Sequence, residues 1–96
     1  MIFVINNLKY DTDKMELVSE KCEWKYKSNS GILYGISFYG KDVKLYKSVK
    51  GNWLLTYTGD YGIIHGVTLN EGKVKSLLLN YDLDVYEKLF GELEEA

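Results

Sequence analysis

The chain has 96 residues, 12 lysines with no arginine, 14 acidic residues and a formal net charge of −2. This length fits one domain, so we expect a single domain over residues 1–96. One cysteine excludes an intrachain disulfide, and one cysteine plus one histidine leave a zinc site short of ligands. No apolar run approaches the roughly 20 residues of a membrane span, and the first residues lack the pattern of a signal peptide. We therefore expect a cytoplasmic protein that binds no cofactor and no membrane.

Short strands are expected in the first part of the chain. Ile2–Ile5 and Leu8–Tyr10 flank an Asn-Asn turn signal, and the Asp-Thr-Asp that follows predicts a second turn. Alternation of apolar and polar residues from Met15 to Lys27 predicts one long antiparallel strand with a solvent-facing side. The chain then predicts a loop at Ser28–Gly31, a strand at Ile32–Phe38 and a turn at Tyr39–Asp42.

A β-hairpin from Val43 to Asp60 is the central element of the prediction. Two alternating runs flank a turn at Lys50-Gly51-Asn52, where glycine and asparagine tolerate positive φ. Trp53 is the expected core anchor, because burying a tryptophan removes roughly 200 Å² from water. A last strand is expected at Ile63–Leu69.

Two short helices are expected after the strands. Asn70 is a favourable N-cap, and the apolar spacing that follows predicts a helix to about Leu79. Asp82 is expected to cap a second helix that ends at Gly91. The predicted class is α+β: an antiparallel sheet of about five or six strands with one or two short C-terminal helices packed on it. The expected core residues are Val43, Leu45, Trp53, Leu55, Leu77, Leu78, Val85 and Leu89.

Catalytic chemistry is not predicted. A nucleophile needs a base and an orienting group, and the chain offers only Cys22 and His65 for such a pair. His65 falls in a predicted strand, where a structural role is favoured. The phosphate-binding and zinc-protease motifs are absent, and Asp11–Asp13 lacks the further ligands of a calcium loop. We expect a protein that is not an enzyme and has no metal site.

Two groups of charged residues are candidates for partner binding. Residues 1–81 hold 11 lysines and 8 acidic residues, whereas residues 82–96 hold 1 lysine and 6 acidic residues. Lysines interleaved with aromatics would track a nucleic-acid backbone while tyrosines stack on bases; the negative net charge and the missing arginine weigh against this. The acidic end would fit a basic groove, or simply solubilise the chain. The candidate residues are Lys41, Lys44, Tyr46, Lys47, Lys50, Glu92, Glu94 and Glu95.

The sequence resembles a family of small proteins that phages and conjugative elements of Gram-positive bacteria carry. Family members show an "ING-x-x-YDT" start, an "LYR/K-x-KKG-x-WF" hairpin and a "LTEEEA…YEKLFGE-x-EE" helical end. The matching positions here are Tyr10-Asp11-Thr12, Leu45-Tyr46-Lys47 with Gly51-Asn52-Trp53, and Tyr86 to Glu95. The chain departs from the pattern at Asn70-Glu71-Gly72-Lys73, which replaces an acidic helix start.

Proteins similar to this family include anti-CRISPR inhibitors of type II-A systems. The resemblance therefore implies a non-enzymatic protein that binds and blocks a Cas9 effector or its guide complex. Two other hypotheses stay open: a nucleic-acid-binding accessory protein of a mobile element, and a phage structural or assembly protein. DNA binding that weakens as salt is raised would distinguish the nucleic-acid-binding protein from the inhibitor.

Overall fold

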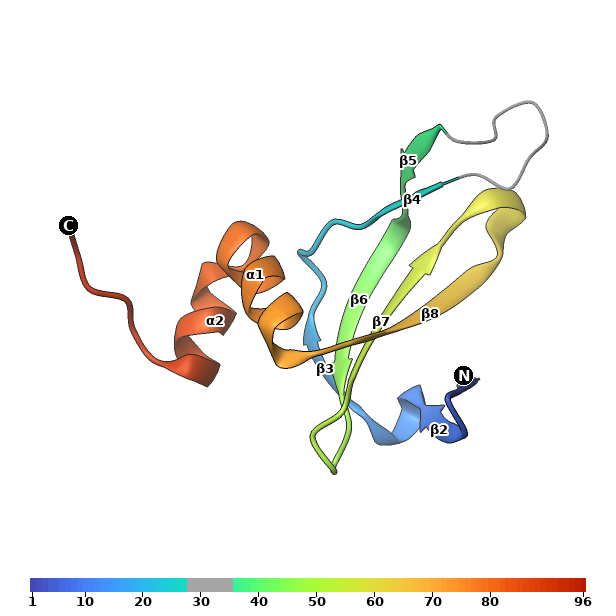
Figure 1. The fold of residues 1–96 in the computed structure, drawn as a ribbon, viewed down its shortest axis with the longest axis horizontal. Coiled ribbons are helices and arrows are strands. Elements are labelled where there is room, and N and C mark those ends of the chain that lie inside the picture. Colours follow the sequence, from blue (N-terminus) through green and yellow to red (C-terminus); the bar gives the residue numbers. More distant parts are fainter. Residues whose placement is uncertain (28–35) are drawn as a thin grey trace.

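The computed structural model describes residues 1–27 and 36–96, and it confirms the α+β class. The predicted loop at Ser28–Gly31 and positions 32–35 of the predicted strand Ile32–Phe38 lie outside the described residues. Over these residues, eight strands precede two C-terminal helices (Figure 1). The elements are β1 (Ile2–Ile5), β2 (Leu8–Asp11), η1 (Thr12–Lys14), β3 (Glu16–Ser19), β4 (Lys25–Lys27), β5 (Ser37–Tyr39), β6 (Lys41–Lys47), β7 (Trp53–Thr58), η2 (Asp60–Gly62), β8 (Ile64–Leu69), α1 (Glu71–Tyr81) and α2 (Leu83–Phe90), with η marking a 3-10 helix.

The strands form three antiparallel sheets instead of the single sheet of five or six strands expected from the sequence. The largest sheet has the order β3-β6-β7-β8, while β1 pairs with β2 and β4 pairs with β5. The hairpin of β6 and β7 lies at the centre of the largest sheet, as predicted. The structure thus confirms the antiparallel pairing and corrects both the number of strands and their division among sheets.

The predicted long strand from Met15 to Lys27 is wrong, because the chain leaves the large sheet after Ser19. Cys22 lies between β3 and β4 and is buried in the main core. The Ser19 hydroxyl donates a 2.6 Å hydrogen bond to the buried carboxylate of Asp82, which ties the end of β3 to the helices. In the sequence, Cys22, Trp24 and Tyr26 continue to alternate with charged residues across the break, so the pattern does not reveal it.

The turn expected at Tyr39–Asp42 is also wrong, because Gly40 alone separates β5 from β6. A Cβ atom on Gly40 would lie 2.8 Å from the Cβ of Tyr57, and this close approach requires glycine. Asp42 has a φ of 49° and lies where the register between β6 and β7 shifts. These features mark a β-bulge at the start of β6, not a turn.

The main hydrophobic core lies between the large sheet and the helices. Directly paired residues share a face of a sheet, so Leu45 and Leu55 point to the same side as Ser19. Both leucines are fully buried. Val85 packs only partly buried against this core, and the prediction for Leu89 is wrong, because its side chain is 37% exposed on α2. The other predicted core residues are confirmed: Val43, Leu45, Trp53, Leu55, Leu77 and Leu78.

A further layer covers the opposite face of the sheet, and the alternation within β7 did not predict it. Leu54 is fully buried and Tyr10 is nearly so, yet neither belongs to the main core cluster. The hairpin of β1 and β2 lies against this face, since a Cβ atom on Gly66 would come within 2.8 Å of the Phe3 ring. Helices, sheet and N-terminal hairpin therefore form three layers, and β7 is buried on both sides.

The two helices begin near their predicted residues but differ from the prediction in detail. The Asn70 side chain accepts a 2.8 Å hydrogen bond from the Lys73 amide, which is the expected N-cap. Helix α1 continues through Tyr81, past its predicted end. Asp82 occupies the N-cap position of α2, but its carboxylate binds Ser19 and caps nothing, which corrects its predicted role. Neither helix of the described chain is long and apolar enough to cross a membrane.

Candidate functional site

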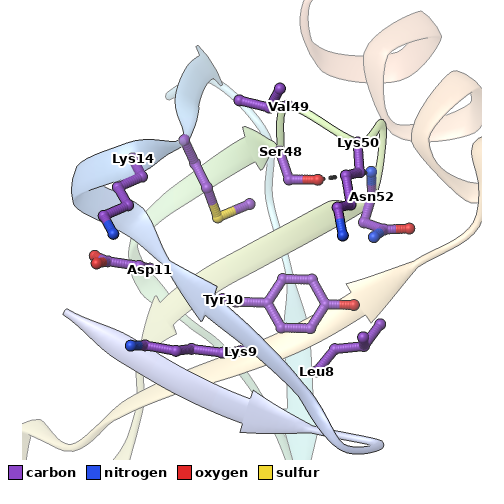
Figure 2. A pocket seen from close by; sticks show the side chains of 10 residues that line it. Leu8, Lys9, Tyr10, Asp11, Lys14, Ser48, Val49, Lys50 and Asn52 are labelled. Atoms are coloured by element: carbon purple, nitrogen blue, oxygen red, sulfur yellow. Dashed lines mark hydrogen bonds between the residues drawn. The ribbon is translucent and has the colours of Figure 1, made fainter.

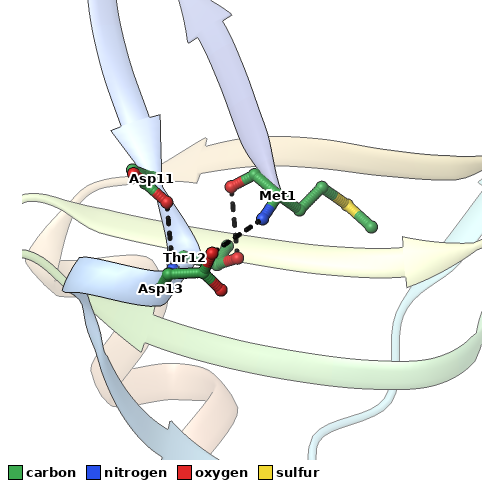
Figure 3. Close-up of polar contacts among 4 residues, drawn as sticks. All are labelled: Met1, Asp11, Thr12 and Asp13. Carbon is green, nitrogen blue, oxygen red and sulfur yellow. Dashed lines mark hydrogen bonds and ion pairs between the residues drawn. The ribbon is translucent and has the colours of Figure 1, made fainter.

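The N-terminal hairpin is held by its turn and by hydrogen bonds at its open end. The Asn6-Asn7 turn has φ angles of 51° and 64°, as tight hairpin turns require. At the open end, Thr12 donates from its amide and its hydroxyl to the Met1 carbonyl, at 2.9 and 3.2 Å. Asp11 accepts a 3.1 Å hydrogen bond from the Asp13 amide and so caps η1 (Figure 3). These contacts fix the direction in which η1 leaves the hairpin.

The turn between β6 and β7 is tied by hydrogen bonds of its own. The Ser48 amide donates to the Asn52 carbonyl at 2.8 Å, and the Asn52 amide donates to the Ser48 hydroxyl at 2.9 Å. Gly51 donates to the Ser48 carbonyl at 2.9 Å and has a φ of +89°, which favours glycine. Val49 is 96% exposed in this turn, so a hydrogen-bonded loop presents an apolar side chain to solvent.

A hollow of about 420 Å³ lies between the N-terminal hairpin and this turn (Figure 2). We call it the turn groove. Segments distant in the sequence form it: β2 and η1 on one side, and the turn on the other. The apolar lining residues are Leu8, Tyr10, Met15 and Val49, the charged ones are Lys9, Asp11, Lys14 and Lys50, and Ser48 and Asn52 complete the wall.

The turn groove carries an excess of positive charge around an apolar floor. Lys9, Lys14 and Lys50 line it and are exposed, whereas Asp11 is the one acidic residue among its lining residues. Asp11 already accepts a hydrogen bond from a backbone amide, which occupies part of its capacity. Figure 2 shows the Tyr10 ring in the space between Leu8 and Lys50. Exposed lysines around apolar side chains favour an acidic segment that also offers an apolar group.

The structure separates the predicted basic residues instead of gathering them. Lys50 lines the turn groove, and Lys47 lines an adjoining hollow of about 450 Å³. The two hollows share Lys14, Met15, Ser48 and Val49. Lys47 also places its Nζ 5.3 Å from the centre of the Trp53 ring.

The other predicted residues of β6 do not line either hollow. Lys44 and Tyr46 lie on the face of β6 that the N-terminal hairpin covers, paired with Thr56 and Leu54. Lys41 is exposed at the far end of the strand, opposite Thr58. Strand alternation divides the predicted cluster between two faces and two ends of β6.

The predicted acidic residues follow α2, which ends at Phe90 and is terminated by Gly91 with a φ of 99°, as expected. Glu92, Glu94 and Glu95 are all exposed in a segment without regular structure. Figure 1 shows this segment extending away from the helices, and none of these glutamates lines the hollows that Lys47 and Lys50 line. The structure therefore does not bring the acidic residues together with the predicted lysines.

Lys9 and Lys14 are the groove lysines that the sequence did not single out as binding residues. Lys9 is in a short strand and Lys14 is in a 3-10 turn. The residues next to them in the sequence form no motif that would indicate a binding site. Only the folding of the N-terminal hairpin onto the sheet brings them beside Lys50. The local sequence pattern therefore does not indicate that these three lysines lie together.

The candidate catalytic pair gains no support from its surroundings. Cys22 contacts the Ser19 hydroxyl at 3.9 Å, while the His65 ring stacks on Tyr57 with a centroid distance of 5.2 Å. Burial raises the pKa of the Cys22 thiol; the Ser19 contact lowers that pKa, and the charge of Asp82 raises it. Within residues 1–27 and 36–96, no three His, Cys, Asp or Glu side chains group as a metal site would.

The Cys22 thiol is expected to react slowly with a disulfide reagent while the protein is folded. A raised pKa means less thiolate at a given pH, and the side chain is 5% exposed. At pH 8 we expect the native protein to react at least about tenfold more slowly than the protein unfolded in guanidinium. The rate of thiol release measured by absorbance checks this, and equal rates would contradict it.

Comparison with known proteins identifies no relative from which a role for the site could be inferred. No family model matches the chain, and no curated protein or solved structure matches it. Function is therefore inferred from the geometry above together with the resemblance carried by the sequence segments.

Proposed function

We propose that the protein is a non-enzymatic inhibitor that binds a protein partner through the turn groove, acting in the bacterial cytoplasm. The resemblance to mobile-element proteins points to a type II-A Cas9 effector, or its guide complex, as that partner. The groove is the observation that supports a binding role, because it joins a concave apolar floor to lysines at its edge. Inhibition would follow from occupying a Cas9 surface or blocking a conformational step that cleavage requires.

A protein partner fits the groove better than nucleic acid does. The lining includes Leu8, Met15 and Val49, and interfaces between proteins bury such side chains at their centre. A nucleic-acid groove instead follows the phosphates with a continuous basic stripe. Here the lysines of β6 are separated, the chain has no arginine and its net charge is −2.

Nucleic-acid binding remains the second candidate, and one observation favours it. Lys9, Lys14 and Lys50 converge on one groove, where their ammonium groups would hold a phosphate. This binding would weaken steeply as salt is raised, because lysines that neutralise phosphates release counterions. Retention on DNA cellulose across a salt gradient measures that dependence.

The cleavage assay tests the proposed function. Purified protein is titrated against Cas9, guide RNA and target DNA, and it is added before or after guide loading. Inhibition near one protein per Cas9 is expected, and the order of addition identifies the blocked step. Absence of inhibition across several type II-A orthologues at large excess would contradict the proposal for Cas9.

A charge-reversal pair connects the groove to the inhibition. The variant Lys14→Glu with Lys50→Glu is expected to weaken inhibition about tenfold or more, which corresponds to about 1.4 kcal/mol of binding free energy. The control is Lys41→Glu with Lys88→Glu, which makes the same change in charge at exposed lysines outside the groove. Equal loss in both pairs would show that net charge, and not the groove, governs binding.

A further inference from the structure

The two edges of the large sheet are built differently. β3 forms one edge with four residues, and its pairing with β6 is interrupted by a register shift between Leu17 and Ser19. β8 forms the other edge with six residues in continuous register with β7, from Thr58–Ile64 to Trp53–Leu69. Short length and a bulge are devices that stop an edge from pairing with another strand, and β8 has neither.

β8 also lacks the side chains that protect an edge. Its sequence IHGVTL contains no lysine, no acidic residue and no proline. Ile64 is 41% exposed, and Tyr61 and Ile63, just before the strand, are 90% and 54% exposed. Among the described residues, β7 is the one strand that pairs with β8 (Figure 1). The edge therefore combines unpaired backbone with exposed apolar side chains.

The register identifies the backbone groups that face outward. The Gly59 amide donates to the Ile63 carbonyl at 2.8 Å, which makes Gly59 and Ile63 a hydrogen-bonded pair. Hydrogen-bonded and non-hydrogen-bonded pairs alternate along antiparallel strands. His65, Val67 and Leu69 therefore bond to β7. By the same alternation, the amides and carbonyls of the alternate residues Ile64, Gly66 and Thr68 point away from the sheet.

We infer that β8 pairs with β8 of a second copy of this chain, joining two large sheets edge to edge. A two-fold axis requires a surface that complements itself. The outward residues meet this requirement, because antiparallel pairing centred on Gly66 sets Ile64 opposite the partner's Thr68 and uses every outward-facing group. A strand without charges also brings no like charges together across the axis. This inference is independent of the proposed function.

Such an interface is small, so we expect a dimer that depends on concentration. Sedimentation equilibrium should show a shift from 11.1 kDa toward twice this mass as concentration rises. Ile64→Lys places a lysine on the edge and is expected to keep the protein monomeric. Leu17→Lys is the matched control, because Leu17 is 43% exposed on the other edge strand and on the same face of the sheet.

Hydrogen exchange of the natural sequence tests the same inference without a substitution. The amides of Ile64, Gly66 and Thr68 should exchange more slowly as the dimer forms, while those of His65 and Val67 keep their protection. A protein that stays monomeric up to about millimolar concentration would overturn the inference. So would a dimer that Leu17→Lys and Ile64→Lys affect equally, or one whose new protection lies outside β8.

Discussion

Replacing Leu54 by alanine is expected to lower the free energy of unfolding by about 2–5 kcal/mol. Leu54 is fully buried, and it faces the N-terminal hairpin instead of the helices. Removing its side chain leaves a cavity between two layers that the backbone cannot close without moving the hairpin. Equilibrium unfolding in urea, followed by tryptophan fluorescence, measures the loss.

Leu17→Ala is the control for this prediction. Leu17 pairs with Tyr46, which in turn pairs with Leu54, so all three side chains share one face of the sheet. Leu17 is 43% exposed, and its replacement is expected to cost less than about 1 kcal/mol. Similar losses at both leucines would show that the hairpin does not seal this face and that the turn groove lacks one of its walls.

Replacing Ser19 by alanine is expected to lower the free energy of unfolding by about 2–3 kcal/mol. The Ser19 hydroxyl donates a 2.6 Å hydrogen bond to the Asp82 carboxylate, and both residues are buried. Alanine removes the hydroxyl donor. The buried carboxylate of Asp82 then loses a hydrogen bond that stabilises its charge. This bond joins β3 to the junction of α1 and α2, so its loss should loosen the helices from the sheet.

Ser76→Ala provides the matched control, because Ser76 is exposed on α1 and its replacement should change stability by less than about 0.5 kcal/mol. A double-mutant cycle with Asp82→Asn isolates the pair. The serine substitution should cost less when position 82 carries no charge. An unchanged cost would assign the effect of Ser19→Ala to packing or to the 3.2 Å hydrogen bond that its hydroxyl accepts from the Lys21 amide, and would contradict the role given to the bond with Asp82.

The central hairpin and the helices were predictable because local signals specify them. The turn at Gly51 follows from a residue that tolerates a φ of +89°, and Asn70 caps α1 with its own side chain. The strand around Ser19 was not predictable in the same way. Its end is set by a hydrogen bond to Asp82, a residue far along the chain, and the alternation continues past the break.

The candidate site was predictable only in part, for a related reason. Lys50 lies in a turn that the sequence marks clearly, and it lines the groove. Lys9 and Lys14 reach the groove because the N-terminal hairpin packs on the sheet, with Phe3 against Gly66. The lysines of β6 appeared to form one cluster, but a strand sends neighbouring side chains to opposite faces.

The sequence by itself determined the α+β class, the antiparallel hairpin of β6 and β7, the positions of two helices and most of the main core. These depend on periodicity, turn residues and caps, which act over a few residues. The tertiary structure alone decided that Leu54 is buried, that the chain leaves the sheet after Ser19 and that three lysines meet in one groove. Each of these features depends on contacts between segments that are distant in the sequence. The energy of those contacts is set by how the layers pack, and not by the local sequence pattern.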